Sequence, residues 1–554
     1  MSTSHTTQAQ ETKPGNPATK TVDAARFSAL SVSAIADDPR LAQRINLPEG
    51  KTYHLGELFE ELSRQTGVSI SADDADSASG KRITVALRDV PLSQAMNAVW
   101  SLLSYQRAYW HWNRTGTGTF AYRLSRSSDA RQYGVSTRQR VQKSFEDEAT
   151  TLLRSLNMTQ EERKILGETN PTAATYLGDE RIRTGLKLLA SLPEATRQAV
   201  LRGEQRMDLR VADLPPSEQA IADTLWNDVR GSSTTSARDV VIRRNTFPGG
   251  ISPWLMIGVG DENRTSGRGY VGGVPFEKEW QQRLGEEWQL PGDKSGDDRE
   301  GQPLKKSEAS DAPKTGDGRD GASLARHLSE VSQASPLSFL ARLPTELPRQ
   351  PAAPAYGKTL ESYLATAQEQ SGLRHKWRDG ILLLEYRGNL TAEESAVPWA
   401  FVKELRASEG TAAQGVLPLS LMAKAAYNLT PPQLFELAGE FPIMTMVADW
   451  QKTFTGLHRS PKRIDAIVSE RGLRIVEMEP LPPGLEVVLD SLKKEGRAAP
   501  ERIRFSRYEG VGQNKEKITS LGVYLLDKDG DTVYGQSYPY KTQTVKAEPT
   551  KPAL

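Results

Sequence analysis

The chain has 554 residues, with 71 basic against 70 acidic side chains, and it contains no cysteine. One hydrophobic core does not support this length, so three or more domains are expected. The charge balance disfavours nucleic-acid and polybasic membrane binding, and the lack of cysteine excludes disulfides, thiolate metal sites and cysteine nucleophiles.

The N-terminal region is polar. Residues 1–50 are rich in Thr, Ala and Ser and predict a disordered leader. The start, from Met1 to Thr7, has neither a basic nor an apolar region, so we expect no signal peptide in the given sequence. No run approaches the roughly 18–20 apolar residues of a membrane span, so no transmembrane segment is expected.

Residues 51–127 predict a first small α/β module of the order α-β-β-α-β-β. Gly67 predicts a left-handed cap at the end of its first helix, whose apolar stripe is Leu55, Leu58, Phe59 and Leu62. Residues 83–87 alternate as a half-buried strand does, and Pro91 suits the first turn of a second helix. Two aromatic-rich strands, at 109–112 and 120–124, flank a glycine turn.

The rest of the chain divides by composition. A capping box at Thr159 and Glu162 and a helix start at Thr430-Pro-Pro-Gln place helices in both halves. The predicted segments are helical at 128–233, β-rich at 234–289, a charged disordered linker at 290–321, a second α/β module at 322–388 with a hairpin at Asp379-Gly380, mainly helical at 389–495, β-rich at 496–540, and a disordered tail at 541–554.

A long repeat connects the two halves. Glu61-Leu62-Ser63 aligns with Glu330-Val331-Ser332 at an offset of 269 residues (330 − 61), and each copy continues into a second helix and a hairpin. The β-rich segments give a similar offset of 268 (523 − 255). A fixed long offset predicts a tandem duplication of a composite unit. The fold class is therefore α+β and multidomain, with each module followed by a helical and a β-rich segment.

The first module resembles the short N-terminal (STN) domain of bacterial secretins and TonB-dependent receptors. The resemblance lies in Leu58-Phe59-Glu-Glu-Leu62-x-x-Gln65-Thr66-Gly67-Val68 and in Leu87-x-Asp89-Val90-Pro91-Leu92-x-x-Ala95-Met96. The second module departs from it, because Pro336 replaces the glycine and Gly357-Lys358-Thr359 replaces the Asp-Val-Pro step. The resemblance covers the two modules alone. It implies a periplasmic or envelope location, partner contact or ring assembly, and no catalytic residues.

Aromatic side chains give the candidate partner-binding surface. Tyr109, Trp110 and Trp112 lie on one predicted strand, and Trp377 occupies the corresponding place in the second module. Such rings either anchor a partner or pack onto the helices of their own module, and the shared position of Trp377 favours packing.

Other motifs favour ordinary structural explanations. Asp527-Lys-Asp529-Gly530-Asp531 begins like a calcium loop, but Tyr538 stands where the bidentate Glu belongs, so a hairpin turn is favoured. The glycines at 258–269 lack a nucleotide-binding pattern and favour a hairpin loop. No zinc-hydrolase, nucleophile-elbow or paired-carboxylate pattern is recognised, and no cofactor or metal is expected.

The sequence thus favours a non-enzymatic envelope protein that contacts an envelope protein or itself, with addition of a strand at an exposed sheet edge as one mode. The alternative is a hydrolase or carbohydrate-binding protein with an aromatic-lined groove between the two halves. A cytoplasmic scaffold also stays open, because no signal peptide is expected.

Overall fold

The computed structural model describes most of the chain. The described residues are mixed α and β structure and include four small sheets. They are 38–73, 78–106, 109–202, 207–230, 239–246, 253–261, 264–271, 286–290, 292–294, 296–305, 321–335, 337–343, 357–386, 396–411, 417–478, 481, 485–494, 496–511 and 517–543.

Module 1 has two helices between two sheets. Its elements are β1 (Arg44–His54), α2 (Leu55–Thr66), β2 (Ser69–Ala72), η3 (Ala78–Gly80), β3 (Arg82–Pro91), α3 (Leu92–Leu103), β4 (Trp110–Thr115) and β5 (Ala121–Arg126). The first sheet pairs β1 with β3, and the second has the order β2-β5-β4. The predicted cap is confirmed, since Gly67 ends α2 with a φ of 66° and its N–H donates to the Ser63 carbonyl.

Module 2 has a similar order of elements, but no described strand corresponds to β3. The elements are α11 (Gly321–Ala334), β10 (Phe339–Arg342), α12 (Leu360–Ser371), β11 (Leu373–Arg378) and β12 (Ile381–Tyr386). Asp379 and Gly380 both have positive φ, at 49° and 76°, which is typical of a type I′ hairpin turn. The predicted hairpin is therefore confirmed.

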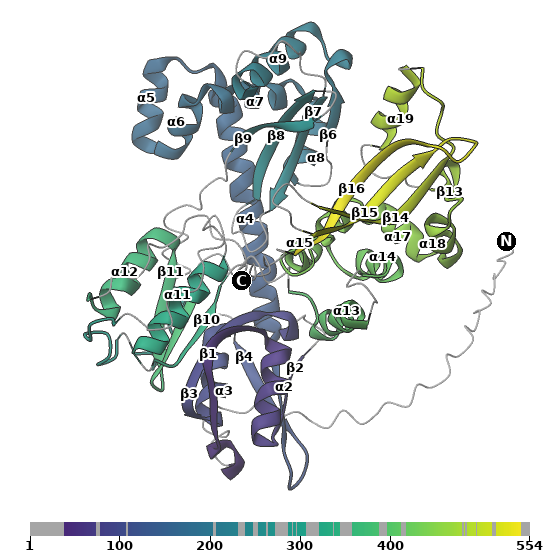
Figure 1. Ribbon diagram of the computed structural model, residues 1–554. Helices are drawn as coiled ribbons and strands as arrows, with labels where there is room; N and C mark the ends of the chain where they lie inside the picture. Colours follow the sequence, from purple (N-terminus) through teal and green to yellow (C-terminus); the bar gives the residue numbers. More distant parts are fainter. Residues whose placement is uncertain are drawn as a thin grey trace, which may run out of the picture.

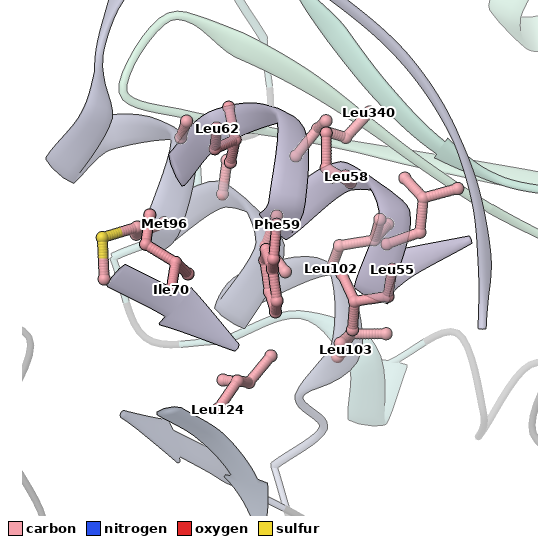
Figure 2. Close-up of a cluster of buried hydrophobic side chains, with 14 of the residues drawn as sticks. Leu55, Leu58, Phe59, Leu62, Ile70, Met96, Leu102, Leu103, Leu124 and Leu340 are labelled. Carbon is pink, nitrogen blue, oxygen red and sulfur yellow. The ribbon is translucent and has the colours of Figure 1, made fainter. Parts of the chain in front are cut away.

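The two modules share one sheet. Strand β3 pairs antiparallel with β10, so the strand order is β1-β3-β10-β12-β11. One face of this sheet lies on the helices of module 1, and Figure 2 shows Leu340 of β10 beside the labelled residues of α2. The other face lies on α11 and α12. Strands β10 and β12 are consequently buried along their whole length, as their apolar sequences require.

A helical region and a meander sheet follow module 1. In Figure 1 the long helix α4 connects the purple module with the blue helices above it. The elements are α4 (Ser128–Arg154), α5 (Gln160–Thr169), α6 (Pro171–Gly178), α7 (Glu180–Ser191), α8 (Glu194–Arg202), β6 (Met207–Arg210), α9 (Pro216–Arg230), β7 (Asp239–Thr246), β8 (Pro253–Asp261) and β9 (Arg264–Val271). The four strands pair antiparallel in chain order, and the capping box at Thr159 is confirmed.

A corresponding region follows module 2. Its elements are α13 (Trp399–Thr411), α14 (Leu419–Asn428), α15 (Pro431–Ala438), α16 (Met444–Asp449), α17 (Gln451–His458), α18 (Pro461–Val468), β13 (Leu473–Arg474), α19 (Leu485–Lys494), β14 (Arg502–Val511), β15 (Lys517–Leu526) and β16 (Thr532–Gln543). Thr430 begins α15 as predicted. The four strands again pair antiparallel in chain order (Figure 1, yellow).

Two predictions of disorder were wrong in part. The leader was expected to extend to residue 50, but β1 begins at Arg44 and pairs with β3, because Ile45 and Leu47 have a core to enter. The linker was expected at 290–321, but Leu290 and Leu304 are buried, and Leu304 packs in the core of module 2. Residues 1–37, 306–320 and 544–554 lie outside the described residues.

Candidate interaction site

The predicted aromatic surface in module 1 is mostly core. Trp110 and Trp112 are 2% and 1% exposed, and the Trp112 indole N–H donates to the Met96 carbonyl of α3 at 3.2 Å. Alternation along β4 turns both rings toward the helices. The two tryptophans therefore stabilise the module and do not form a partner-binding surface.

Trp377 of module 2 is also buried, at 1% exposure. Its indole N–H donates to Glu300 Oε1 at 2.5 Å, and the Arg299 guanidinium lies 4.9 Å from the ring centre. It is covered by the segment that was predicted to be a disordered linker. Tyr109, at 42% exposure, is the one predicted aromatic residue that remains on the surface.

We call residues 286–305 the strap, of which 291 and 295 are not described. The strap contacts both modules. On module 1, the Gln106 N–H donates to the Glu287 carbonyl at 2.7 Å, and the Trp288 indole donates to the Leu102 carbonyl at 3.3 Å. On module 2, Lys294 exchanges backbone hydrogen bonds with Trp377 at the outer edge of β11. The strap thus joins the modules at a second place, apart from the β3–β10 pairing.

A buried ion cluster fixes the strap. Asp293 accepts from Lys376 at 3.0 Å and from Arg378 at 3.3 Å, with both partners on β11. The Lys376 ammonium also donates to the Trp288 carbonyl at 2.7 Å. Burial lowers the pKa of Lys376 to about 8, against the opposing attraction of Asp293. Removing one partner of a buried ion pair leaves the other charge buried and uncompensated. Loss of either Asp293 or Lys376 would therefore destabilise the junction.

A second buried carboxylate lies on the same face of the shared sheet. Glu385 of β12 is 3% exposed, and its Oε1 accepts from the Tyr105 hydroxyl at 2.9 Å and from Arg342 at 3.4 Å. Its Oε2 has no hydrogen-bond partner among the described residues. Burial raises the pKa of Glu385 to about 7, although Arg342 and Tyr105 act in the opposite direction.

Side chains occupy edge groups of β1 and β2. Ser63 of α2 bonds to both the N–H and the carbonyl of Ile70, at 3.0 and 3.4 Å. Gln65 does the same for Asn46, at 3.2 and 3.3 Å. These contacts block strand addition at two edges that a partner strand would need.

Module 1 also contacts the helical region that follows module 2. The His54 ring stacks on Trp399 with 5.4 Å between centres, and His54 Nε2 lies 3.6 Å from Glu440 Oε2. Arg406 donates to Glu440 at 2.5 and 3.2 Å. Burial by itself raises the pKa of Glu440, but the contacts with His54 and Arg406 outweigh it and lower the pKa to about 2.

Close backbone approach marks the same contact. A Cβ at Gly80 would lie 1.5 Å from the Val397 carbonyl oxygen. The Trp399 N–H donates to the Ser79 hydroxyl at 3.0 Å. Glycine is therefore required at position 80 for this docking.

The remaining motifs have structural roles. Asp527 Oδ1 accepts from the N–H groups of Asp529 and Asp531, both at 2.9 Å, which confirms a hairpin turn. Strands β8 and β9 form a hairpin where one was expected, but Gly258 and Gly260 lie in the β8 strand and not in the loop, whose residues 262–263 lie outside the described residues. A cavity of about 280 Å³ lies between α4, α7 and α8, and it is lined by Thr150, Leu153, Arg154, Ala190, Glu194, Arg197 and Gln198.

No family model, curated protein or solved structure matches the chain. Among the described residues, no cluster of three or more His, Asp or Glu side chains could hold a metal ion. No described helix combines the length and the apolar character needed to cross a membrane.

Proposed function

We propose that this chain is a non-enzymatic protein of the bacterial cell envelope, which mediates protein–protein contact or assembly through two STN-like modules. The observation that supports this most is the β3–β10 pairing, in which Leu340 lies opposite Val85 and enters the core of the other module. One module of this type thus forms an extensive contact with another.

We further infer a tandem duplication of the whole composite unit. In module 1, β2 runs parallel to β5, and β5 antiparallel to β4. In module 2, β10 runs parallel to β12, and β12 antiparallel to β11. In each half a helical region follows the module and leads into strands, and these strands form a four-stranded antiparallel meander. A shared topology across three successive parts favours duplication over chance.

The proposed partner is an envelope protein or a second copy of this chain, with the periplasm as the proposed location and no role for nucleic acid. Because side chains or the strap occupy edge groups of β1, β2 and β11, the contact is expected to use a surface side chain instead of an added strand. Tyr109 is the candidate, since an exposed tyrosine supplies a large contact area at small entropic cost.

The test is mass measurement in solution, together with cross-linking of the tagged full chain in envelope extracts. We expect self-association or one specific cross-linked partner, which Tyr109→Ser weakens at least fivefold. Tyr427→Ser is the matched control, because Tyr427 is 49% exposed and lies on α14, outside both modules. A monomer without a partner, or equal losses in both variants, would contradict the proposal.

The described residues do not favour a hydrolase or carbohydrate-binding protein. It requires aromatic side chains along a groove between the halves, whereas Trp110, Trp112 and Trp377 are buried. The cavity between α4, α7 and α8 has no aromatic residue in its lining.

A further inference from the structure

Three parts of the chain come together near Glu385. Arg342 of β10 and Tyr105, just after α3, donate to its carboxylate. The strap reaches this junction through neighbouring residues: its Glu287 carbonyl accepts from Gln106, next to Tyr105, and its Trp288 carbonyl and Asp293 hold Lys376, whose charge acts on Glu385. Glu287 of the strap also accepts a hydrogen bond from Tyr133 of α4. The strap therefore closes a junction that holds ionisable groups away from water.

The carboxylate at this junction is incompletely paired. An ionised carboxylate has about four acceptor positions, and Glu385 uses one oxygen for two donors while the other oxygen has none among the described residues. Leaving a buried oxygen unpaired costs more when it carries charge. Protonation removes that cost without displacing Tyr105, whose hydroxyl can still donate to the neutral acid.

We propose that Glu385 makes the strap a pH-sensitive latch between the two modules, held more firmly as the medium is acidified and loosened as the pH rises through neutrality. The latch controls the contact between strap and sheet. It does not depend on which partner the protein binds.

Proton linkage determines how the stability of the closed strap changes with pH. The pKa of Glu385 is about 7 in the closed junction, against an ordinary value of 4.5 when the group meets water. The closed form therefore binds the proton more tightly. The stabilisation is complete below the ordinary pKa and is lost as the pH rises through 7.

Other groups face the same carboxylate. Arg342 comes from β10, Lys376 from β11, and Lys81 from the turn before β3. Arg374 of β11 lies opposite Glu385 in the strand register. Lys376 acts at higher pH with the opposite sign, because its pKa of about 8 lies below the ordinary 10.5, so closure is favoured again above 8.

His375 lies on the other face of β11, with its Nε2 3.5 Å from Glu300 of the strap. Burial lowers the pKa of His375, so its own contribution favours opening in acid and opposes that of Glu385. The comparison that isolates Glu385 is thus between the wild type and Glu385→Gln, which imitates the protonated acid.

The test is hydrogen exchange of the full chain, with rates corrected for the intrinsic effect of pH. The reporters are the N–H groups of Lys294 and Trp377, which bond across the strap–β11 contact. From pH 8 to pH 6, protection in the wild type is expected to rise about tenfold relative to Glu385→Gln. Glu330→Gln on α11, which removes a carboxylate paired with Arg326, should follow the wild type.

Equal pH dependence in the wild type and Glu385→Gln would overturn the proposal. If Glu385→Gln does not fold, Tyr105→Phe replaces it. Losing the donor to the ionised carboxylate raises the pKa of Glu385 further, so the protection ratio between pH 6 and pH 8 should exceed that of the wild type. An unchanged ratio in Tyr105→Phe would also overturn it.

Discussion

The two modules share a strand order but differ in what covers them. The helices of module 1 lie between two sheets, β2-β5-β4 and the shared sheet. The helices of module 2 cover only the outer face of the shared sheet, whose other face belongs to the core of module 1. The two modules thus share a strand order but differ in how far each depends on the other. Module 2 depends on module 1, because the helices of module 1 cover the second face of its sheet.

The modules are also anchored to different segments. Module 1 contacts the start of α13 through Gly80 and His54, whereas module 2 is held by the strap through Trp377 and Asp293. The strap also reaches module 1, since Trp288 lies in its core and donates to the Leu102 carbonyl, but its ion cluster is with β11 of module 2. The two modules therefore differ in their contacts although their strand order is similar.

The largest effect is expected from Leu340→Ala. Leu340 is fully buried and belongs to module 2 by sequence, but it packs in the core of module 1. The cavity should lower the free energy of unfolding by about 3 kcal/mol, as for other buried leucines. Urea unfolding measures the loss, and hydrogen exchange should show α2 losing protection.

Leu364→Ala is the matched control, since Leu364 is 1% exposed and lies on the α12 side of the sheet. It should reduce protection in α12 before α2. If Leu340→Ala leaves the protection of α2 unchanged, the modules are independent, and module 2 does not share a core with module 1.

A smaller effect is expected from Gly80→Ala. The added Cβ would meet the Val397 carbonyl, so η3 or the segment before α13 must shift, at about 2 kcal/mol. Thermal unfolding should show a lower midpoint, with α13 losing protection and the strap keeping it. Gly178→Ala is the control, because nothing lies within 4 Å of its added Cβ. Equal loss in the strap would show that the two anchors are coupled.

Local signals in the sequence were sufficient to predict where many of the helices and turns begin or end. Gly67, Pro91, Asp379-Gly380 and the capping box at Thr159 each mark a boundary that the structure has. These signals are local, because a cap or a turn depends on the backbone of its own few residues. They could not show that β3 and β10 pair, since that contact joins residues about 250 positions apart.

The charged residues of β11 show why composition did not predict the strap. Arg374, Lys376 and Arg378 alternate along β11 with Leu373, His375 and Trp377, a pattern typical of a strand with one face in water. Here that face is covered by the strap, whose polar composition predicted disorder. Composition indicates how much apolar surface a segment has, but not whether its charges find buried partners. The same limit hid Glu385, which sits in an otherwise apolar strand.

The smallest effect is expected at Glu440, and it distinguishes the two anchors by the sign of their response to acid. The pKa of Glu440 is about 2, below its ordinary 4.5, so its stabilisation is present above 4.5 and is lost as the pH falls toward 2. Since the side chain is one-third exposed, solvent screening limits the loss to about 1 kcal/mol.

Glu440→Gln should lack this acid-dependent loss. The measurement is the difference in unfolding free energy between the wild type and Glu440→Gln at pH 5 and pH 3, with hydrogen exchange in α13 as the local reporter. Acid would then act oppositely on these two contacts. From pH 7 to 4.5 it tightens the strap through Glu385, and below 4.5 it loosens the contact of module 1 with α13. Parallel profiles for the wild type and Glu440→Gln would show that Glu440 does not control that contact.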